Sequence, residues 1–380
     1  MIERLLLQMG RLLLAAGALA LLVALLDGLP VSTAVGCAVG FLIGREPLPD
    51  LWFLLTHRLG GVRLALISYG RGRRLWRGTI AGVPVEVGLR PTSGLYLPWC
   101  LLPSRTPRLR LWLASTGQAV LHAGLGLWLA TSFTGPTRGI GFGLLFTFGL
   151  LALTRGKSLV SSLWPVLVLP FAGPEALGDE VWTPHGFEAE RLLLQGRIGE
   201  ARGRVEEAPI APHEAGVAAV IVLAQGRYQG AEELARAALE HDWNNINAHS
   251  FLGLAIVGQV DSGELSPERG VARLGPALAA FGHNDRAIVR SVLPAADLAR
   301  FTGDHEAAVR AARRLRSGYR VSLWIALAEC SLAAALIAAQ RAEEARKALA
   351  RARREYPELA RIADVERLLE HEPPPATAPR

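Results

Sequence analysis

The sequence predicts a mainly α-helical protein in two parts: a multi-span helical membrane domain with a small β-hairpin insert, then a helical-repeat domain. Three observations predict this division. Apolar residues crowd into the first 172 positions, and an alternating, glycine-rich stretch interrupts them at 58–110. A pattern of helical period, rich in alanine, leucine, arginine and glutamate, runs from about residue 187 onward. Long apolar runs are typical of membrane spans, and alternation is typical of strands.

Composition and charge narrow the class of protein. The chain has 380 residues, of which 51% are hydrophobic, with a mean hydropathy of +0.27 and a formal net charge of +7. Its arginines concentrate beside apolar runs, where basic residues set membrane topology, so we expect no nucleic-acid partner. The three cysteines, Cys37, Cys100 and Cys330, are far apart and form no CxxC pair. They predict neither a disulfide framework nor a structural zinc site.

The apolar half, residues 1–178, is expected to cross a membrane several times. The expected spans are 5–26, 31–56, 111–132 and 139–154, with 158–172 as a re-entrant or interfacial segment. A cleaved signal peptide is the alternative for the first span, but the run is long and no A-x-A site follows it. Arginines on the insert, with Arg155 and Lys157, mark the cytoplasmic side. We therefore expect the lipid bilayer as a partner, and a bacterial inner-membrane location with a cytoplasmic C-terminal domain.

The insert at 58–110 carries ten arginines and one acid, Glu86. Its alternation and regular glycines predict short strands and hairpins. The order of apolar segment, insert and second apolar segment resembles the core of the site-2 protease family, the intramembrane zinc metalloproteases. The matching pieces are HRLGGVRL at 57–64, YGRG at 69–72, GLY at 94–96 and RLRLW at 108–112. The resemblance covers about residues 48–125 and implies a similar membrane fold.

The zinc motif that this resemblance implies is missing from the sequence. The family's H-E-x-x-H falls on 49–53, where Pro49 and Phe53 replace the histidines and Asp50 replaces the glutamate. Neither proline nor phenylalanine can ligate a metal. The family's later aspartate ligand corresponds to Asp179. We therefore expect a non-catalytic relative without a cofactor. The alternative is an active metallopeptidase whose zinc has atypical ligands, with His122 and Asp179 as candidates.

His122 has two interpretations that do not depend on the resemblance. It lies in the apolar run 111–132, with Gln118 one helical turn before it. An ionisable side chain inside a predicted span indicates a functional site. A buried histidine bonded to a backbone carbonyl is the other interpretation.

A helical-repeat domain is predicted at 187–370, after a linker at 179–186 and before a disordered tail at 371–380. The string GRYQGAEELARAALEHDWNNINAHSFLGLAIVGQ resembles a tetratricopeptide repeat, whose period is 34 residues. Antiparallel helices pack closely where small residues occupy the crossing points. The expected packing residues are Ala219, Tyr228, Ala231, Ala238, Gly253, Ala308, Ala333 and Ala345.

Together these patterns predict a membrane protein that binds rather than catalyses. The repeats are expected to hold a protein or peptide partner at the membrane. This prediction has two alternatives: an active intramembrane metallopeptidase and a membrane-anchored scaffold.

Overall fold

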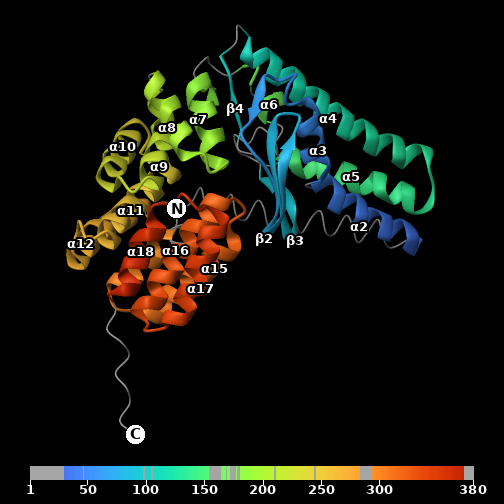
Figure 1. The fold of residues 1–380 in the computed structure, drawn as a ribbon. Helices are drawn as coiled ribbons and strands as arrows, with labels where there is room; N and C mark the ends of the chain where they lie inside the picture. The colour runs from blue at the N-terminus through green and yellow to red at the C-terminus, as the bar shows by residue number, and fades with distance from the viewer. Residues whose placement is uncertain are drawn as a thin grey trace. The chain divides into compact units, whose positions relative to one another are not determined.

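The computed structural model describes residues 30–45, 47–96, 99–103, 106–153, 164–167, 169–171, 177, 180–208, 211–243, 245–282 and 293–371. The chain divides into two compact units. The first comprises Met1–Val62 with Ser104–Ala176, and the second comprises Arg63–Pro103 with Leu177–Arg380. The described elements are mainly helices, with a small amount of β-hairpin sheet (Figure 1). This confirms the mainly α class and the β-rich insert.

The first unit is built from helices that approach one another closely. Its elements are α2 (Val31–Arg45), α3 (Pro47–Thr56), α4 (Pro107–Ser132), α5 (Gly135–Leu153) and α6 (Trp164–Leu167). A Cβ added at Gly36 or Gly40 of α2 would lie 2.0 or 2.2 Å from a backbone oxygen of α5. Gly139 and Gly143 of α5 face α2 in the same way. Because residues four apart share a helix face, these glycines let the two backbones meet.

The prediction of a multi-span membrane domain is contradicted. Among the described residues, no helix combines the length and the apolar character needed to cross a membrane. This overturns the predicted integral membrane protein, its membrane-anchored and intramembrane-peptidase alternatives, and the inner-membrane location with cytoplasmic segments. The expected span 5–26 lies outside the described residues, and 158–172 is described only in part.

The reason that no membrane-crossing helix forms differs from one predicted span to the next. The expected span 31–56 forms two helices, α2 with 15 residues and α3 with 10, whereas a crossing needs about 20. Helix α4 has 26 residues, but Ser115, Gln118 and His122 interrupt its apolar sequence. Helix α5 carries Arg138 in its opening turns.

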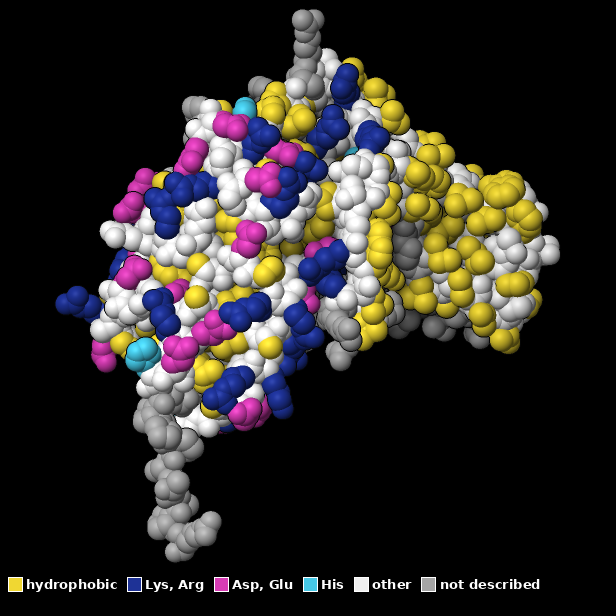
Figure 2. All heavy atoms as spheres, viewed as in Figure 1, with side chains coloured by type: hydrophobic (Ala, Val, Ile, Leu, Met, Phe, Trp, Pro, Cys, Tyr) yellow, Lys and Arg dark blue, Asp and Glu magenta, His cyan; other side chains and the backbone are white. Residues whose placement is uncertain are grey.

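Large apolar side chains remain exposed on the first unit. Figure 2 shows hydrophobic side chains gathered over α2, α4 and α5, while charged side chains gather over the helices of the second unit. The most exposed include Val31 at 81% and Leu42 and Val120 at 64%. The described residues therefore leave much of this unit's apolar surface uncovered.

The second unit begins with two small sheets. Strands β1 (Val62–Leu64) and β4 (Trp99–Leu101) pair with each other, and β2 (Ile67–Ile80) forms an antiparallel hairpin with β3 (Val83–Tyr96). Ala81 and Gly82 make a two-residue turn with φ of 50° and 82°. Positive φ at both positions matches the right-handed twist of a hairpin, and glycine adopts it without steric cost.

The β2–β3 hairpin is held against the helices by polar contacts. Ser68 Oγ donates to the Arg320 carbonyl at 2.8 Å, and Glu86 accepts from Ser322 Oγ at 2.8 Å. Arg77 pairs with Glu355 at 2.7 Å. The same Glu86 lies 3.1 Å from the buried Arg74 Nε. The hairpin therefore packs on the stretch where one helix ends and the next begins, around residue 320.

The rest of the second unit is an array of helices in antiparallel succession (Figure 1). Its elements are α7 (Pro184–Leu194), α8 (Ile198–Glu207), the 3₁₀ turn η2 (Pro212–Glu214), α9 (Ala215–Ala224), α10 (Tyr228–His241), α11 (Ile246–Asp261), α12 (Pro267–Gly282), α14 (Leu293–Phe301), α15 (His305–Gly318), α16 (Ser322–Ala338), α17 (Ala342–Glu355) and α18 (Arg361–Glu370).

Four of the helix–helix connections repeat one turn. In each, an N–H bonds to a carbonyl five residues earlier, as from Arg197 to Leu192 and from Arg227 to Val222. The residue just before that N–H has positive φ, and it is Gly196, Gly226, Gly303 or Gln340. This is the Schellman arrangement, which satisfies the last carbonyls of a helix and reverses the chain in few residues.

The residues predicted to pack between helices, small residues and Tyr228, are all buried. Gly253 has no room for a side chain, because an added Cβ would lie 2.6 Å from Pro294 Cγ. Tyr228 is 1% exposed, and its ring lies against Gly258. The remaining members are alanines that are at most 2% exposed: Ala219, Ala231, Ala238, Ala308, Ala333 and Ala345.

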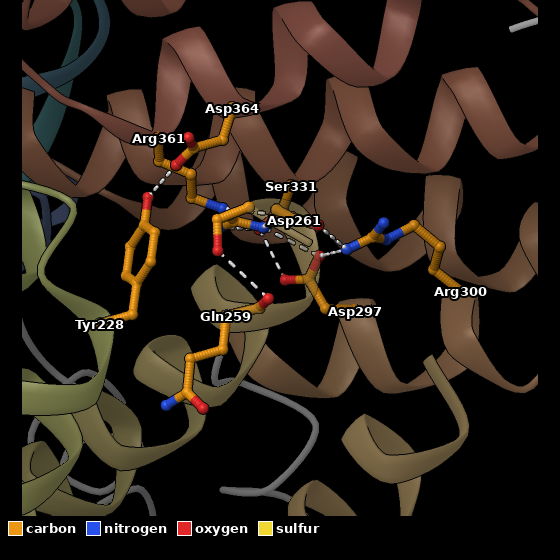
Figure 3. A network of polar contacts seen from close by, with 9 residues as sticks. Tyr228, Gln259, Asp261, Asp297, Arg300, Ser331, Arg361 and Asp364 are labelled. Carbon is orange, nitrogen blue, oxygen red and sulfur yellow. Dashed lines mark hydrogen bonds and ion pairs between the residues drawn. The ribbon is translucent and has the colours of Figure 1, made fainter. Parts of the chain in front are cut away.

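A buried ionic network joins helices that are distant in sequence (Figure 3). Arg361 of α18, only 1% exposed, bonds to Asp261 of α11 at 3.0 Å and to Asp297 of α14 at 3.1 Å. It also donates to Ser331 Oγ of α16 at 2.9 Å. Arg300 pairs with both aspartates, so two cations face two carboxylates. The charges are balanced without solvent, which is the condition for tolerating buried ions.

Removing the central arginine tests the importance of this network. Arg361→Ala is expected to lower the free energy of unfolding by about 3–5 kcal/mol, because it leaves one cation for two buried carboxylates. Urea-induced unfolding followed by circular dichroism measures this.

The matched control is Arg346→Ala, which removes an ion pair with Glu343 whose side chains are 57% and 80% exposed. Surface pairs contribute little, so its unfolding curve is expected to match the wild type. Equal effects of the two substitutions would contradict a dominant role for Arg361.

Candidate functional site

The second unit contains an open cavity of about 740 Å³. Its walls come from α7, α9, α11 and the start of α16, with β4 and the ends of η2 and α10 at the rim. The cavity combines aromatic rings with ionisable groups. Its lining includes Trp99, Glu180, Trp182, Glu190, His213, His241, Asp242, Phe251, Tyr319, Arg320 and Trp324.

One wall is a cluster of aromatic rings. The rings of Phe251 and Trp324 are stacked, with centroids 5.7 Å apart and planes 3° from parallel. Tyr319 lies 6.4 Å from Trp324. Gly216 makes room for this pair, since an added Cβ would lie 3.3 Å from Phe251 Cε2. Phe251 is buried while Trp324 and Tyr319 stay partly exposed, so the wall presents aromatic surface to a ligand.

The rim of the cavity is fixed by backbone and carboxylate bonds. The Trp182 N–H donates to the Leu101 carbonyl at 2.8 Å, which ties the segment before α7 to β4. The buried Glu214 accepts from the Thr183 hydroxyl and from the Ala211 N–H, each at 2.9 Å. It also accepts from the Thr183 N–H. These bonds hold Trp182 and His213 on fixed backbone.

Glu190 is the distinctive ionisable group of the cavity. It lies on α7 with part of its surface reaching the cavity, and desolvation by the surrounding protein raises the pKa of its carboxyl to about 7. Burial is the sole cause of that shift, and among the described residues no ion pair to Glu190 occurs. A carboxylate held without a cation is energetically costly.

The cavity as a whole is acidic. Glu180, Glu190 and Asp242 supply three carboxyl groups, whereas Arg320 supplies one guanidinium. The rings of His213 and His241 face each other with centroids 6.5 Å apart, and His213 Nε2 lies 3.2 Å from the Val181 carbonyl. The arrangement suits binding: it offers apolar rings, acceptor oxygens and enclosed volume.

Three of the residues that the sequence resemblance assigned to a zinc site, Pro49, Asp50 and Phe53, lie in the first unit. Pro49 and Phe53 are buried in α3, and the Pro49 carbonyl accepts from Gln118 Nε2 at 3.2 Å. Asp50 lies on the same helix, partly buried. Helix α3 therefore meets α4 one turn before His122. Asp179 lies outside the described residues.

His122 is buried in α4, and its ring lies 5.8 Å from that of Phe148. Burial lowers its pKa, and a hydrogen bond with the Leu144 backbone partly opposes this. Across the described ranges, no group of three or more histidine, cysteine, aspartate or glutamate side chains is placed to hold a metal ion. The zinc alternative thus gains no ligand set from the residues that the structure describes.

The cavity was missed by sequence reasoning. A signal was present, because aromatic residues recur next to the first helix of several hairpins: Trp182 before α7, Tyr319 before α16, and Phe251 within α11. A carboxylate at Glu190, two residues before the apolar run at 192–194, was a second signal. Neither pattern shows that these segments converge.

Comparison of the chain with protein-family models, with curated proteins and with solved structures finds no match in any of the three.

The raised pKa of Glu190 makes a prediction about stability. The folded-state pKa of about 7 lies above the usual value of 4.5, so the native state holds a proton that the unfolded chain releases. Stability from this group is greatest below pH 4.5 and is lost as pH rises through 7. Glu190→Gln is therefore expected to raise the thermal unfolding midpoint at pH 8 and to change it much less at pH 5.

Differential scanning fluorimetry at the two pH values measures this. Glu188→Gln is the matched control, because Glu188 lies on the same helix but pairs with Arg191. A midpoint at pH 8 that is no higher in Glu190→Gln than in wild type would refute the desolvated carboxyl.

Proposed function

We propose that the second unit is a tetratricopeptide-like repeat domain whose cavity binds a peptide segment of a partner protein. The aromatic cavity is the observation that carries this proposal. Its volume of about 740 Å³ is within the roughly 300–1,000 Å³ of ligand sites, enough for a few side chains. The stacked Phe251–Trp324 wall supplies the kind of rigid apolar anchor that dominates binding energy.

The helical array supports the same proposal. Successive antiparallel helices with buried alanines at recurring positions are the architecture that a 34-residue period predicts. Arrays of this type expose the first helices of their hairpins along one surface. Helices α7, α9, α11 and α16 each contribute to the cavity, and each is the first of its pair. A partner segment lying there would touch several repeats at once.

A peptide array tests the proposal with the full chain. Randomised acetylated decapeptides are screened with labelled protein, and the tightest binders are titrated by fluorescence anisotropy. Trp324→Leu is expected to weaken the best binder at least tenfold, since aromatic anchors contribute about 2 kcal/mol or more. Leucine keeps an apolar side chain at the start of α16, so the fold is expected to persist.

Trp243→Ala provides the control. Trp243 is 60% exposed and lies outside the cavity lining, so its loss is expected to leave affinity unchanged. Unfolding curves of both variants show whether either has lost its structure. The proposal is overturned if no peptide binds more tightly than about 100 μM, or if a folded Trp324→Leu binds like the wild type.

A further inference from the structure

We infer that the cavity selects a cationic side chain, lysine or arginine, of the bound segment, and that this cation pairs with Glu190. The inference rests on the proposed function, because it specifies the chemistry of the peptide that the cavity takes.

Glu190 differs from several carboxylates of this unit in having no ion pair among the described residues. Several buried carboxylates of this unit have cations from the chain itself: Asp261 and Asp297 face Arg361 and Arg300, and Glu329 faces Arg351 at 2.8 Å. The buried Glu214 has no cation but accepts hydrogen bonds from Thr183 and Ala211. Glu190 is only half-buried, but desolvation raises the pKa of its carboxyl and no ion pair offsets that loss of hydration among the described residues. A ligand cation at Glu190 would compensate that loss, which a neutral side chain would not.

The walls of the cavity are rich in aromatic rings. Aromatic faces attract cations, and they also pack against the methylene stems of lysine and arginine. Tyr319, Trp324, Trp99 and Trp182 all line the cavity. A carboxylate among aromatic rings therefore matches a long side chain with an apolar stem and a charged end. An acidic side chain would meet three carboxyl groups and one guanidinium, so repulsion disfavours it.

Other titratable groups near Glu190 bear on how binding depends on pH. Those that line the cavity are Glu180, His213, His241, Asp242, Tyr319 and Arg320. Cys100 of β4 is close enough for Glu190 to raise its pKa further, after burial has already raised it, so this thiol stays neutral. On α7 itself, Glu188 pairs with Arg191 and His185 faces Glu207. Helix α9 contributes no titratable side chain.

The experiment uses the tightest decapeptide from the array in five versions, with lysine, arginine, glutamine, norleucine or glutamate at its central position. Wild-type protein at pH 8 is expected to bind the lysine and arginine versions at least tenfold more tightly than the glutamine and norleucine versions, and the glutamate version most weakly. In Glu190→Gln this preference is expected to fall to about twofold. Glu188→Gln is expected to keep it.

Acidification provides a second readout. Binding a cation requires the carboxylate form, so affinity for the lysine version is expected to fall about tenfold from pH 8 to pH 6, across a pKa of about 7. Protonation of His213 or His241 would act in the same direction. Glu190→Gln shows whether Glu190 or the histidines cause the pH dependence. If affinity no longer changes with pH in this variant, Glu190 is the cause. If the pH dependence is the same as in wild type, that assignment is overturned.

The outcomes distinguish this inference from the proposed function. If peptides bind and depend on Trp324 but show no preference for lysine or arginine, the cavity is a peptide site and the cation inference is wrong. A preference that survives in Glu190→Gln also overturns it. If no peptide binds, the proposed function fails first, and with it the basis for the inference.

Discussion

The buried pairing of Arg361 with Asp261 and Asp297 is the interaction on which the second unit depends most. It joins α18 to α11 and α14 over separations of 100 and 64 residues, and it reaches α16 through Ser331. A helix displaced from its place would leave a charge without its counterion, away from water. Such a network therefore favours one arrangement of helices over others of similar apolar burial. Helices α11 and α16 are also those that carry Phe251 and Trp324, so this ionic centre helps to fix the aromatic wall of the cavity.

Two carboxyl groups of the second unit show how environment shifts a pKa in opposite directions. Desolvation opposes ionisation at Asp261, but Arg300 and Arg361 outweigh it and hold its pKa below the usual value. At Glu190 desolvation acts alone and raises the pKa to about 7. The first carboxylate is satisfied within the fold. The second has no ion pair among the described residues, and it lines the cavity.

The sequence predicted what depends on local periodicity. Helical period and recurring alanines predicted the helices of the second unit, and Ala219, Ala231 and Ala345 are fully buried. Alternation and glycines predicted the hairpin. The membrane spans were wrong because apolar composition does not show where a helix ends: α2 stops at Arg45, and Gln118 and His122 interrupt α4. The cavity was not predictable, since its lining is drawn from segments between Trp99 and Trp324 that no local pattern connects.

The β2–β3 hairpin explains why the position of Tyr319 and Trp324, at the connection from α15 to α16, could not be predicted from the sequence. Ser68 bonds to the Arg320 carbonyl and Glu86 accepts from Ser322, two residues apart on the connection that carries Tyr319 and leads to Trp324. The separations are 252 and 236 residues. Local propensity leaves this connection free to adopt several turns, so its conformation is set by a strand from the other end of the unit. The hairpin is thus a structural support of the cavity, and the orientation of its aromatic wall follows from long-range hydrogen bonds rather than from the repeat pattern.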